Sequence, residues 1–517
     1  TNAVRSGSAG ELTGVESRSK KDSGYYALII TAIGSGLLSL FTPCVYPMLP
    51  VTVAFFLKQE EKKAGSSLVL AIVYSLSMVI AFTIFGVGMS FLFGASSANV
   101  VANNPWLNLF FAAVFMAFAL MFFGVFEIHV PSWLLTWTSK REASGGLIGV
   151  VFMALTFTLV SFTCTFAFVG QIAILAQGGS IFKAIVGMVA FGATFASPFF
   201  LLAMFPSVLS RMPRSGGWMN RVKVTIGLVE LAMVLKFLSV ADIGFSSNGL
   251  PVFLDRASFL VGWMAISVVT GFYLLGLFRL TSDMEVKGVP VLQVLLSIMF
   301  FAVGGYIGVG LFASTPPSGW VWGQIVAMAP PDFQTGTGTS HGGGKQAMTV
   351  RKDDVFGSVV EHHGLVFGLD FDRAVAEATR SGMPLFIDFT GVNCPNCRNM
   401  EHDVLSQPQM ISLLSKMVRV QLYTDTVPGV ENREERDRIL EFNRNLQEQW
   451  FKDSSLPGYA VATSDGKTVL AEFAGYDNSR GVDFERFLTM GLKQFEKLAQ
   501  HRPTELKPSA TSTAAME

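Results

Sequence analysis

The chain has 517 residues, of which 50% are hydrophobic and 15% charged, with 46 phenylalanines and a mean hydropathy of +0.46. This composition predicts a polytopic membrane protein with a soluble appendage and excludes a purely soluble chain. Lys plus Arg and Asp plus Glu number 38 each, and no basic stripe with interleaved aromatic residues is present, so nothing in the sequence supports nucleic-acid binding.

Residues 1–25 begin at Thr1 and lack the apolar core of a signal peptide, so we expect an N-terminal tail and a chain processed or truncated from a longer one. Eight apolar runs follow, each long enough to cross a hydrocarbon core about 30 Å thick. We therefore expect residues 26–313 to form a polytopic α-helical membrane domain. The runs are residues 26–57, 68–93, 106–126, 147–176, 181–209, 224–240, 258–279 and 289–313.

The loops between these runs carry an uneven share of positive charge. The first, third, fifth and seventh loops hold eleven Lys and Arg residues, whereas the second, fourth and sixth hold only Lys183 and Arg256. Because loops rich in Lys and Arg stay in the cytoplasm, both ends of the chain are predicted to face outward. Arg18, Lys20 and Lys21 before the first span favour the opposite orientation, and the summed loops outweigh them.

The two cysteines of the membrane half lie in related sequences. Residues 41–44, FTPC, resemble residues 162–164, FTC, and three spans separate the copies, so their topologies are inverted. Inverted repeats place the working site at their interface near mid-membrane. Cys44 and Cys164 are therefore candidate site residues, although a lone cysteine in an apolar helix is usually a small buried hydrophobe.

Prolines beside the first of these cysteines predict a broken helix. Pro43 and Pro47 each remove a helical N–H and clash with the preceding turn, which exposes backbone where a cavity can use it. No proline follows Cys164 closely. Two charged residues of the sixth span, Glu230 and Lys236, are expected to line a cavity or hold a structural partner rather than to act in catalysis.

Composition changes after the last span. Residues 314–366 are rich in Pro, Gly, Ser and Thr and are expected to be a flexible linker. His341, His362 and His363 lie in this stretch, but their spacing is poor for a metal ligand set and no cysteine is near. We therefore expect them to be solvated, and we expect no metal site.

Residues 367–500 have the composition of an ordinary α/β domain, followed by a tail at 501–517. Periodicity predicts strand, helix, strand, helix, hairpin, helix after a first amphipathic helix, which is a thioredoxin-like pattern. The predicted elements are helices at 370–379, 431–451 and 484–498, one further helix after Cys397, strands at 383–389 and 417–423, and a hairpin of 461–463 with 469–473.

The CPNC sequence at Cys394 and Cys397 opens one of these helices. Unpaired N–H groups at a helix N-terminus stabilise a thiolate, so Cys394 is predicted to attack and Cys397 to resolve. Asp388, at the end of the preceding strand, is a candidate proton acceptor for Cys397. The peptide bond between Leu456 and Pro457 is expected to be cis and to face the dithiol. The alternatives are a static disulfide or a zinc site, and zinc would need a second ligand pair that this half lacks.

One thiol in each membrane half and a soluble dithiol indicate electron transfer across a bilayer. With FTPCVYPMLP, SFTCTFAFVGQ, FASPFFLLAMFPSVLSRMP and DFTGVNCPNC, the chain resembles, over residues 26–500, the DsbD family of bacterial thiol:disulfide interchange proteins. The membrane part of that family is related to the smaller CcdA proteins.

The resemblance implies a multi-pass protein of the bacterial inner membrane with its thioredoxin-like domain in the periplasm. Cys44 and Cys164 would form a reversible disulfide that cytoplasmic thioredoxin reduces, with electrons ultimately from NADPH and no bound cofactor. Electrons would then pass to Cys394 and Cys397 and on to periplasmic disulfide proteins. Family members commonly carry an outer immunoglobulin-like domain for that last step, which residues 1–25 cannot supply, and Asn393 stands where a tryptophan is often found.

Two other functions remain open at this stage. The first is a small-solute or metal transporter with an attached thioredoxin-like chaperone, since inverted repeats and mid-membrane prolines suit it equally well. The second is a CcdA-like role dedicated to cytochrome c maturation, which differs only in the final electron acceptor.

Overall fold

A computed structural model describes most of the chain. The described residues are 25–40, 67–125, 149–159, 161, 165, 181–204, 217–280, 289–313, 317, 319–335, 348–353, 355–451 and 454–501. Contacts divide the chain into two compact units, residues 1–94 with 130–212 and residues 95–129 with 213–517.

The first unit holds apolar helices with an aromatic core. Its helices are α1 (Tyr25–Ser39), most of α3 (Ser67–Ala102), a short helix at Gly149–Leu159 and α7 (Ile181–Met204). Phe191, Phe195 and Phe199 follow one another at four-residue spacing on α7 and contact Phe82 of α3 and Phe157 of the short helix. These five phenylalanines form an aromatic core of the first unit.

Proline and glycine shape α7 and its neighbour. Pro198 lies inside α7 and cannot donate to the Thr194 carbonyl, but the Ser197 hydroxyl donates to that oxygen at 2.8 Å. A Cβ atom at Gly36 of α1 would lie 2.9 Å from the Thr194 Cβ atom. Glycine at position 36 therefore allows α1 and α7 to approach closely.

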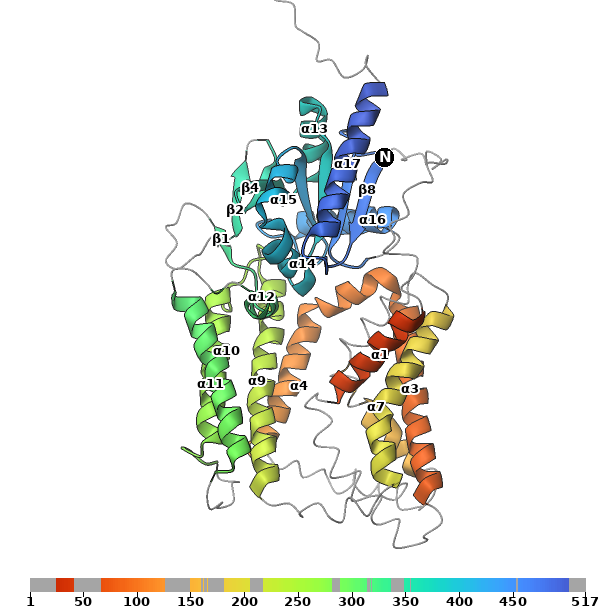
Figure 1. Cartoon of the computed structure of the whole chain (residues 1–517), viewed down its shortest axis with the longest axis vertical. Helices are drawn as coiled ribbons and strands as arrows, with labels where there is room; N and C mark the ends of the chain where they lie inside the picture. The colour runs from red at the N-terminus through yellow and green to blue at the C-terminus, as the bar shows by residue number, and fades with distance from the viewer. Residues whose placement is uncertain are drawn as a thin grey trace, which may run out of the picture. The chain divides into compact units, whose positions relative to one another are not determined.

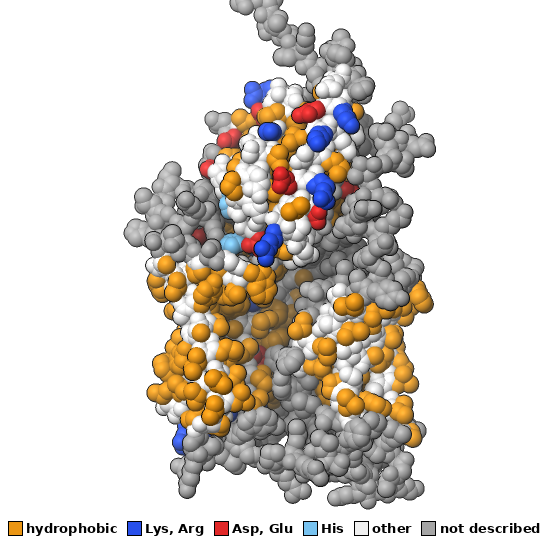
Figure 2. Space-filling model, viewed as in Figure 1, with side chains coloured by type: hydrophobic (Ala, Val, Ile, Leu, Met, Phe, Trp, Pro, Cys, Tyr) orange, Lys and Arg blue, Asp and Glu red, His pale blue; other side chains and the backbone are white. Residues whose placement is uncertain are grey.

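The second unit begins with four membrane helices that pack in sequence. They are α4 (Pro105–Phe122), α9 (Gly217–Phe245), α10 (Arg256–Leu274) and α11 (Val291–Phe312). Figure 1 shows α9 beside α4 and beside α10, and α10 beside α11. In Figure 2 hydrophobic side chains dominate the visible faces of the membrane helices, as lipid-facing surfaces require.

All eight predicted spans contain a helix. Within the described residues, six helices are long and apolar enough to cross a membrane, and the shorter apolar helices Leu28–Ser39 and Gly149–Leu159 lie in the first and fourth predicted spans. The prediction of about eight transmembrane helices is consistent with this arrangement. Four candidate site residues lie outside the described residues, namely Cys44, Cys164, Pro43 and Pro47.

A mixed eight-stranded sheet forms the core of the α/β part, with the order β1-β2-β3-β4-β6-β5-β7-β8. Central strand β5 (Leu385–Thr390) is fully buried, runs parallel to β6 (Val418–Tyr423) and antiparallel to β7 (Gly458–Ala462). The outer strands are β1 (Phe333–Thr335), β2 (Met348–Asp353), β3 (Gly357–His362), β4 (Leu365–Gly368) and β8 (Val469–Ala474).

Helices pack on this sheet in the predicted order. They are α13 (Phe371–Ser381), α14 (Pro395–Met400), the π-helical turn η1 (Glu401–Leu405), α15 (Pro408–Leu414), α16 (Arg433–Phe451) and α17 (Val482–His501). Asp370 caps the first of these through its contact with the Arg373 N–H, and Gly382 ends it at a φ of +67°. The thioredoxin-like order read from the sequence is confirmed.

The stretch expected to be a flexible linker, 314–366, differs from that expectation where it is described. It holds α12 (Trp320–Met328) and strands β1, β2 and β3. His363 and Gly364, with φ of +52° and +73°, make the two-residue turn between β3 and β4. The polar composition of the stretch gave no indication of these strands, although Val359 and Val360 of β3 are completely buried.

The α/β part contacts the end of α9 within the second unit. The buried Arg436 guanidinium of α16 donates to the Ser246 and Ser247 carbonyls at 3.2 and 3.0 Å. The Gly429 N–H donates to the Asn248 carbonyl at 2.8 Å. Ile243 and Leu250 share a hydrophobic cluster with side chains of the sheet and α16, so apolar burial accompanies the hydrogen bonds.

Candidate functional site

Cys394 and Cys397 form a disulfide at the start of α14. Cys394 is the N-cap residue, Pro395 follows at the first helical position, and the Cys397 N–H donates to the Cys394 sulfur at 3.1 Å. Cys394 is half-buried, whereas Cys397 is 1% exposed. Cys394 is therefore the more accessible of the two cysteines, and its role as the attacking residue stays a prediction.

The loop between β5 and α14 is held by a carboxylate from the end of β6. Asp425 accepts the Val392 N–H and the Asn393 N–H, both at 2.8 Å, and the Thr426 N–H at 2.6 Å. Burial raises the pKa of Asp425, and these three hydrogen bonds oppose that effect. Asp425 thereby fixes the backbone immediately before Cys394.

Two buried carboxyl groups, those of Asp388 and Glu401, are linked by the side chain of Gln421. Asp388 of β5 accepts a hydrogen bond from the Gln421 side chain at 3.0 Å, and Gln421 also donates to Glu401 at 3.3 Å. Burial, and then the charge of Glu401, raise the pKa of Asp388 to about 8. Burial raises the pKa of Glu401 to about 7 against the opposing charge of Arg398. Both groups therefore exchange protons near neutral pH.

Arg398 links the helix to this pair. Its guanidinium lies 2.8 Å from Glu401 with both side chains almost fully buried, and it donates to the Thr390 hydroxyl at 3.2 Å and to the Gly391 carbonyl at 3.3 Å. The Arg398 guanidinium therefore links the end of β5, the loop after it and the start of the π-helical turn through hydrogen bonds.

The peptide bond between Leu456 and Pro457 is cis, as predicted. The Pro457 carbonyl accepts the Gly475 N–H at 2.8 Å. A Cβ atom at Gly391 would lie 3.2 Å from a methyl group of Leu456, which places the residue before the proline against the loop that leads to Cys394.

The membrane helices of the second unit hold the other charged residues that the sequence singled out. Glu230 of α9 is completely buried, and neither carboxylate oxygen has a hydrogen-bond partner among the described residues. Lys236 lies on the same helix. Within the part of the chain that the structure describes, no group of three or more His, Cys, Asp or Glu side chains is arranged to hold a metal ion.

Comparisons with known proteins match both halves of the chain. The family described as cytochrome C biogenesis protein transmembrane domain matches residues 25–241, and a thioredoxin-like family matches residues 368–461. Thiol:disulfide interchange protein DsbD of Vibrio cholerae is 30% identical over 46% of this chain and 39% of the relative. DsbD 1 of Pseudomonas aeruginosa is 26% identical over 72% and 57%, and DsbD of Vibrio vulnificus is 26% identical over 77% and 59%.

The chain is thus similar to the DsbD proteins in both its membrane part and its thioredoxin-like domain. It spans between about two fifths and three fifths of the length of these relatives. Its apolar helices and its DsbD-family relatives make it a multi-pass protein of the bacterial inner membrane. The resemblance read from the four sequence motifs is confirmed.

Sequence reasoning singled out the dithiol, Asp388 and Pro457 but missed the residues that surround them. Asp425 could have been recognised from the sequence, because it follows β6 at the edge of the sheet where the parallel strand β5 also ends. Gln421 could also have been recognised, since it is a polar residue between the apolar residues Val420 and Leu422 of β6. The Arg398–Glu401 pair has the i, i+3 spacing of a helical ion pair, but the sequence does not reveal its burial.

Proposed function

We propose that this chain is a transmembrane thiol:disulfide oxidoreductase that relays electrons from the cytoplasm to disulfide-bearing proteins in the periplasm. The observation that carries the proposal is the Cys394–Cys397 disulfide, with one accessible and one buried sulfur, on a domain joined to DsbD-family membrane helices. Cysteine pairs alone hold the electrons, so the proposal includes no bound cofactor.

The relay consists of successive two-electron exchanges. Cytoplasmic thioredoxin, itself reduced at the expense of NADPH, reduces a disulfide between Cys44 and Cys164. One of the resulting thiolates attacks the Cys394 sulfur and displaces the Cys397 thiolate, which takes up a proton. The second membrane thiolate then breaks the mixed disulfide, so the membrane pair is reoxidised and the outer pair is reduced.

The reduced outer pair repeats the chemistry on its substrate. Cys394 attacks the disulfide of a periplasmic acceptor, and Cys397 resolves the mixed disulfide, releasing the reduced acceptor. Asp388 and Glu401, whose pKa values of about 8 and 7 lie near neutrality, supply proton donors and acceptors in the same buried network. The prolines at 43 and 47 are proposed to break the first helix so that the membrane pair opens to one side at a time.

Two observations together support the proposed orientation. The distribution of Lys and Arg favours an outward-facing sixth loop, and residues of that loop, Ser246 to Asn248, bond to the α/β domain. Both support a periplasmic thioredoxin-like domain and outward-facing chain ends.

The relay is tested by alkylation trapping in cells. Cys44→Ser or Cys164→Ser is expected to leave Cys394 and Cys397 oxidised, and removal of thioredoxin reductase activity is expected to oxidise all four cysteines. Ser406→Ala, a change in a hydroxyl that bonds only locally to the His402 carbonyl, is the matched control. Reduced outer cysteines in either membrane variant would exclude the relay.

A solute transporter is not favoured, because the relatives of the chain are thiol:disulfide interchange proteins. The family description of the membrane part names cytochrome c biogenesis, which favours a haem-attachment pathway as one destination of the electrons. Staining for covalently bound haem in cells lacking the protein tests that destination separately.

A further inference from the structure

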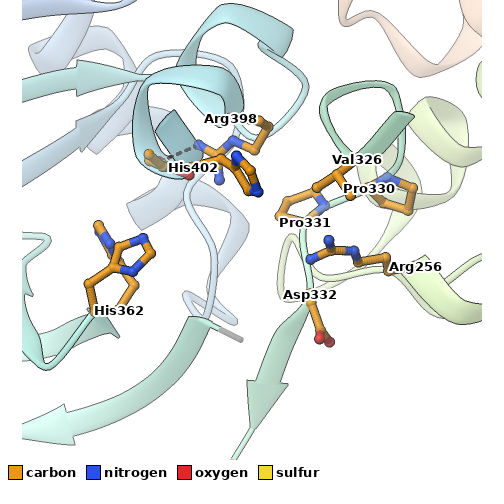
Figure 3. A pocket seen from close by; sticks show the side chains of 10 residues that line it. Arg256, Val326, Pro330, Pro331, Asp332, His362, Arg398 and His402 are labelled. Atoms are coloured by element: carbon orange, nitrogen blue, oxygen red, sulfur yellow. Dashed lines mark ion pairs between the residues drawn. The ribbon is translucent and has the colours of Figure 1, made fainter. Parts of the chain in front are cut away.

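A pocket of the second unit has no role in the proposed relay. Side chains from the start of α10, the segment after α12, strand β3 and the turn after α14 line it, and neither cysteine does (Figure 3). The cavity has a volume of about 40 Å³. Since one water molecule needs roughly 10–15 Å³ of cavity volume, the cavity has room for a few waters or one small oxyanion.

His362 is the observation that points to a ligand. It is 4% exposed, lines the pocket, and neither ring nitrogen has a hydrogen-bond partner among the described residues. Its ring stacks on Phe367 at 4.4 Å, which fixes its plane. A buried imidazole in this position costs free energy unless a bound group accepts its N–H.

A second imidazole in the pocket is oriented by a carboxylate. His402 bonds through Nδ1 to Asp403 at 2.7 Å, and the Tyr476 hydroxyl donates to the other Asp403 oxygen at 2.9 Å. His402 and Asp403 both lie in η1, the π-helical turn after α14. This bond leaves Nε2 of His402 for a ligand, as a donor to an oxyanion or as an acceptor from a protonated phosphate.

Two arginines, Arg256 and Arg398, and two carboxylates, Asp332 and Glu401, line the pocket. Arg256 contributes a guanidinium from the first turn of α10, whereas Arg398 is already paired with Glu401 at 2.8 Å. In Figure 3 the Asp332 carboxylate points away from Arg398 and His402. Arg256 and the two imidazoles therefore remain as possible hydrogen-bond donors to a ligand.

We propose that this pocket binds a phosphate group, held by Arg256, His402 and His362. The phosphate belongs either to a free inorganic ion or to a lipid headgroup. Arg256 begins a membrane span, so its side chain lies at the depth where headgroup phosphates occur. The inference goes beyond the relay and does not depend on it.

The test uses the full chain in a phosphate-free maltoside detergent. Inorganic phosphate and phosphatidic acid are titrated separately, and the thermal unfolding midpoint is followed. A saturable rise with inorganic phosphate identifies a free ion, and a rise with phosphatidic acid alone identifies a headgroup. No saturable rise with either probe would overturn the proposal.

Variants assign the effect to the pocket. Arg256→Gln and His402→Asn are each expected to raise the apparent Kd about 10-fold or more, because each removes a charged or oriented hydrogen bond. Arg486→Gln, an exposed arginine paired with Asp483, is the matched control and should leave the Kd unchanged. The unfolding midpoint without ligand reports whether each variant is folded, and His362→Gln provides a third variant. Equal affinity in all folded variants would also overturn the proposal.

Discussion

Asp388 is a buried acid in the centre of the sheet, and its ionisation should control the pH dependence of stability. Its folded-state pKa of about 8 lies above its usual value of 3.8, with burial as the main cause and Glu401 as the next. Between these two pH values the folded state binds more protons than the unfolded state. Stability therefore falls as pH rises from about 4 to about 8.

Asp388→Asn should reduce this fall, since an amide cannot ionise. The variant is expected to gain stability relative to the unaltered chain as pH rises, by up to about 1.4 kcal/mol per pH unit within that window. Glu401, with a pKa of about 7, should leave a residual slope. The measurement is the thermal unfolding midpoint of the oxidised full chain between pH 5 and pH 8.

The matched control for this change is Asp483→Asn on the exposed face of α17, where the carboxylate pairs only with Arg486 at the surface. Its pH profile should match that of the unaltered chain. A profile for Asp388→Asn that runs parallel to the control would show that the buried carboxyl does not titrate in this range.

At the scale of elements, the loop between β5 and α14 depends on a side chain from the end of β6. Asp425→Ala would remove the acceptor of the Val392 and Asn393 N–H groups, and Val392 is 1% exposed. Buried unpaired N–H groups cost about 1–3 kcal/mol each, so the free energy of unfolding should fall by at least that much. Alkylation of Cys394 after reduction should also become less selective over Cys397, because the helix start is no longer held.

Asp425→Asn removes the negative charge of Asp425 but keeps a hydrogen-bond acceptor at this position. The amide oxygen can still accept one N–H, so the loss of stability should be smaller than in the alanine variant. Denaturant unfolding of the full chain and mass spectrometry of the alkylated cysteines give both readouts. Equal stability of the alanine variant and the unaltered chain would contradict a clamping role for Asp425.

Local chemistry made several elements predictable from the sequence. Cys394 followed by proline predicts a helix start, and Asp370 with Gly382 marks both ends of α13. Apolar runs of membrane length predicted the six helices that are long enough to cross a membrane, and the two shorter apolar helices lie in the other two predicted spans. In each case the information lies within a few turns or one span of the chain.

The rest depended on contacts between distant segments. His362 was expected to be solvated because its neighbours are polar, yet β4 and the Phe367 ring cover it. Burial of Arg398 with Glu401 follows from packing of α14 on the sheet, which no helical spacing reveals. The membrane site remains a prediction, since Cys44 and Cys164 lie outside the described residues.

At the scale of the whole molecule, contacts of the α/β domain with the residues after α9 join its soluble and membrane parts. Asp242 of α9 accepts the N–H groups of residues 252, 253 and 254 at 2.9, 2.9 and 3.1 Å, which shapes the segment that Arg436 then contacts. A relay requires the soluble dithiol to meet both the membrane pair and a separate acceptor. The strength of this contact therefore bears on how readily the domain changes partners.

Arg436→Met should weaken the contact with the residues after α9 without leaving a cavity, because methionine retains much of the apolar stem of arginine. The two carbonyls of Ser246 and Ser247 lose their charged donor. Hydrogen exchange measured by mass spectrometry on the full chain is expected to accelerate about 10-fold in residues 246–250 and around Gly429, while β5 stays protected. Arg433→Gln, an exposed change on the first turn of the same helix, is the control. Exchange that is unchanged in the methionine variant, or raised equally in the control, would mean that Arg436 does not hold the two parts together.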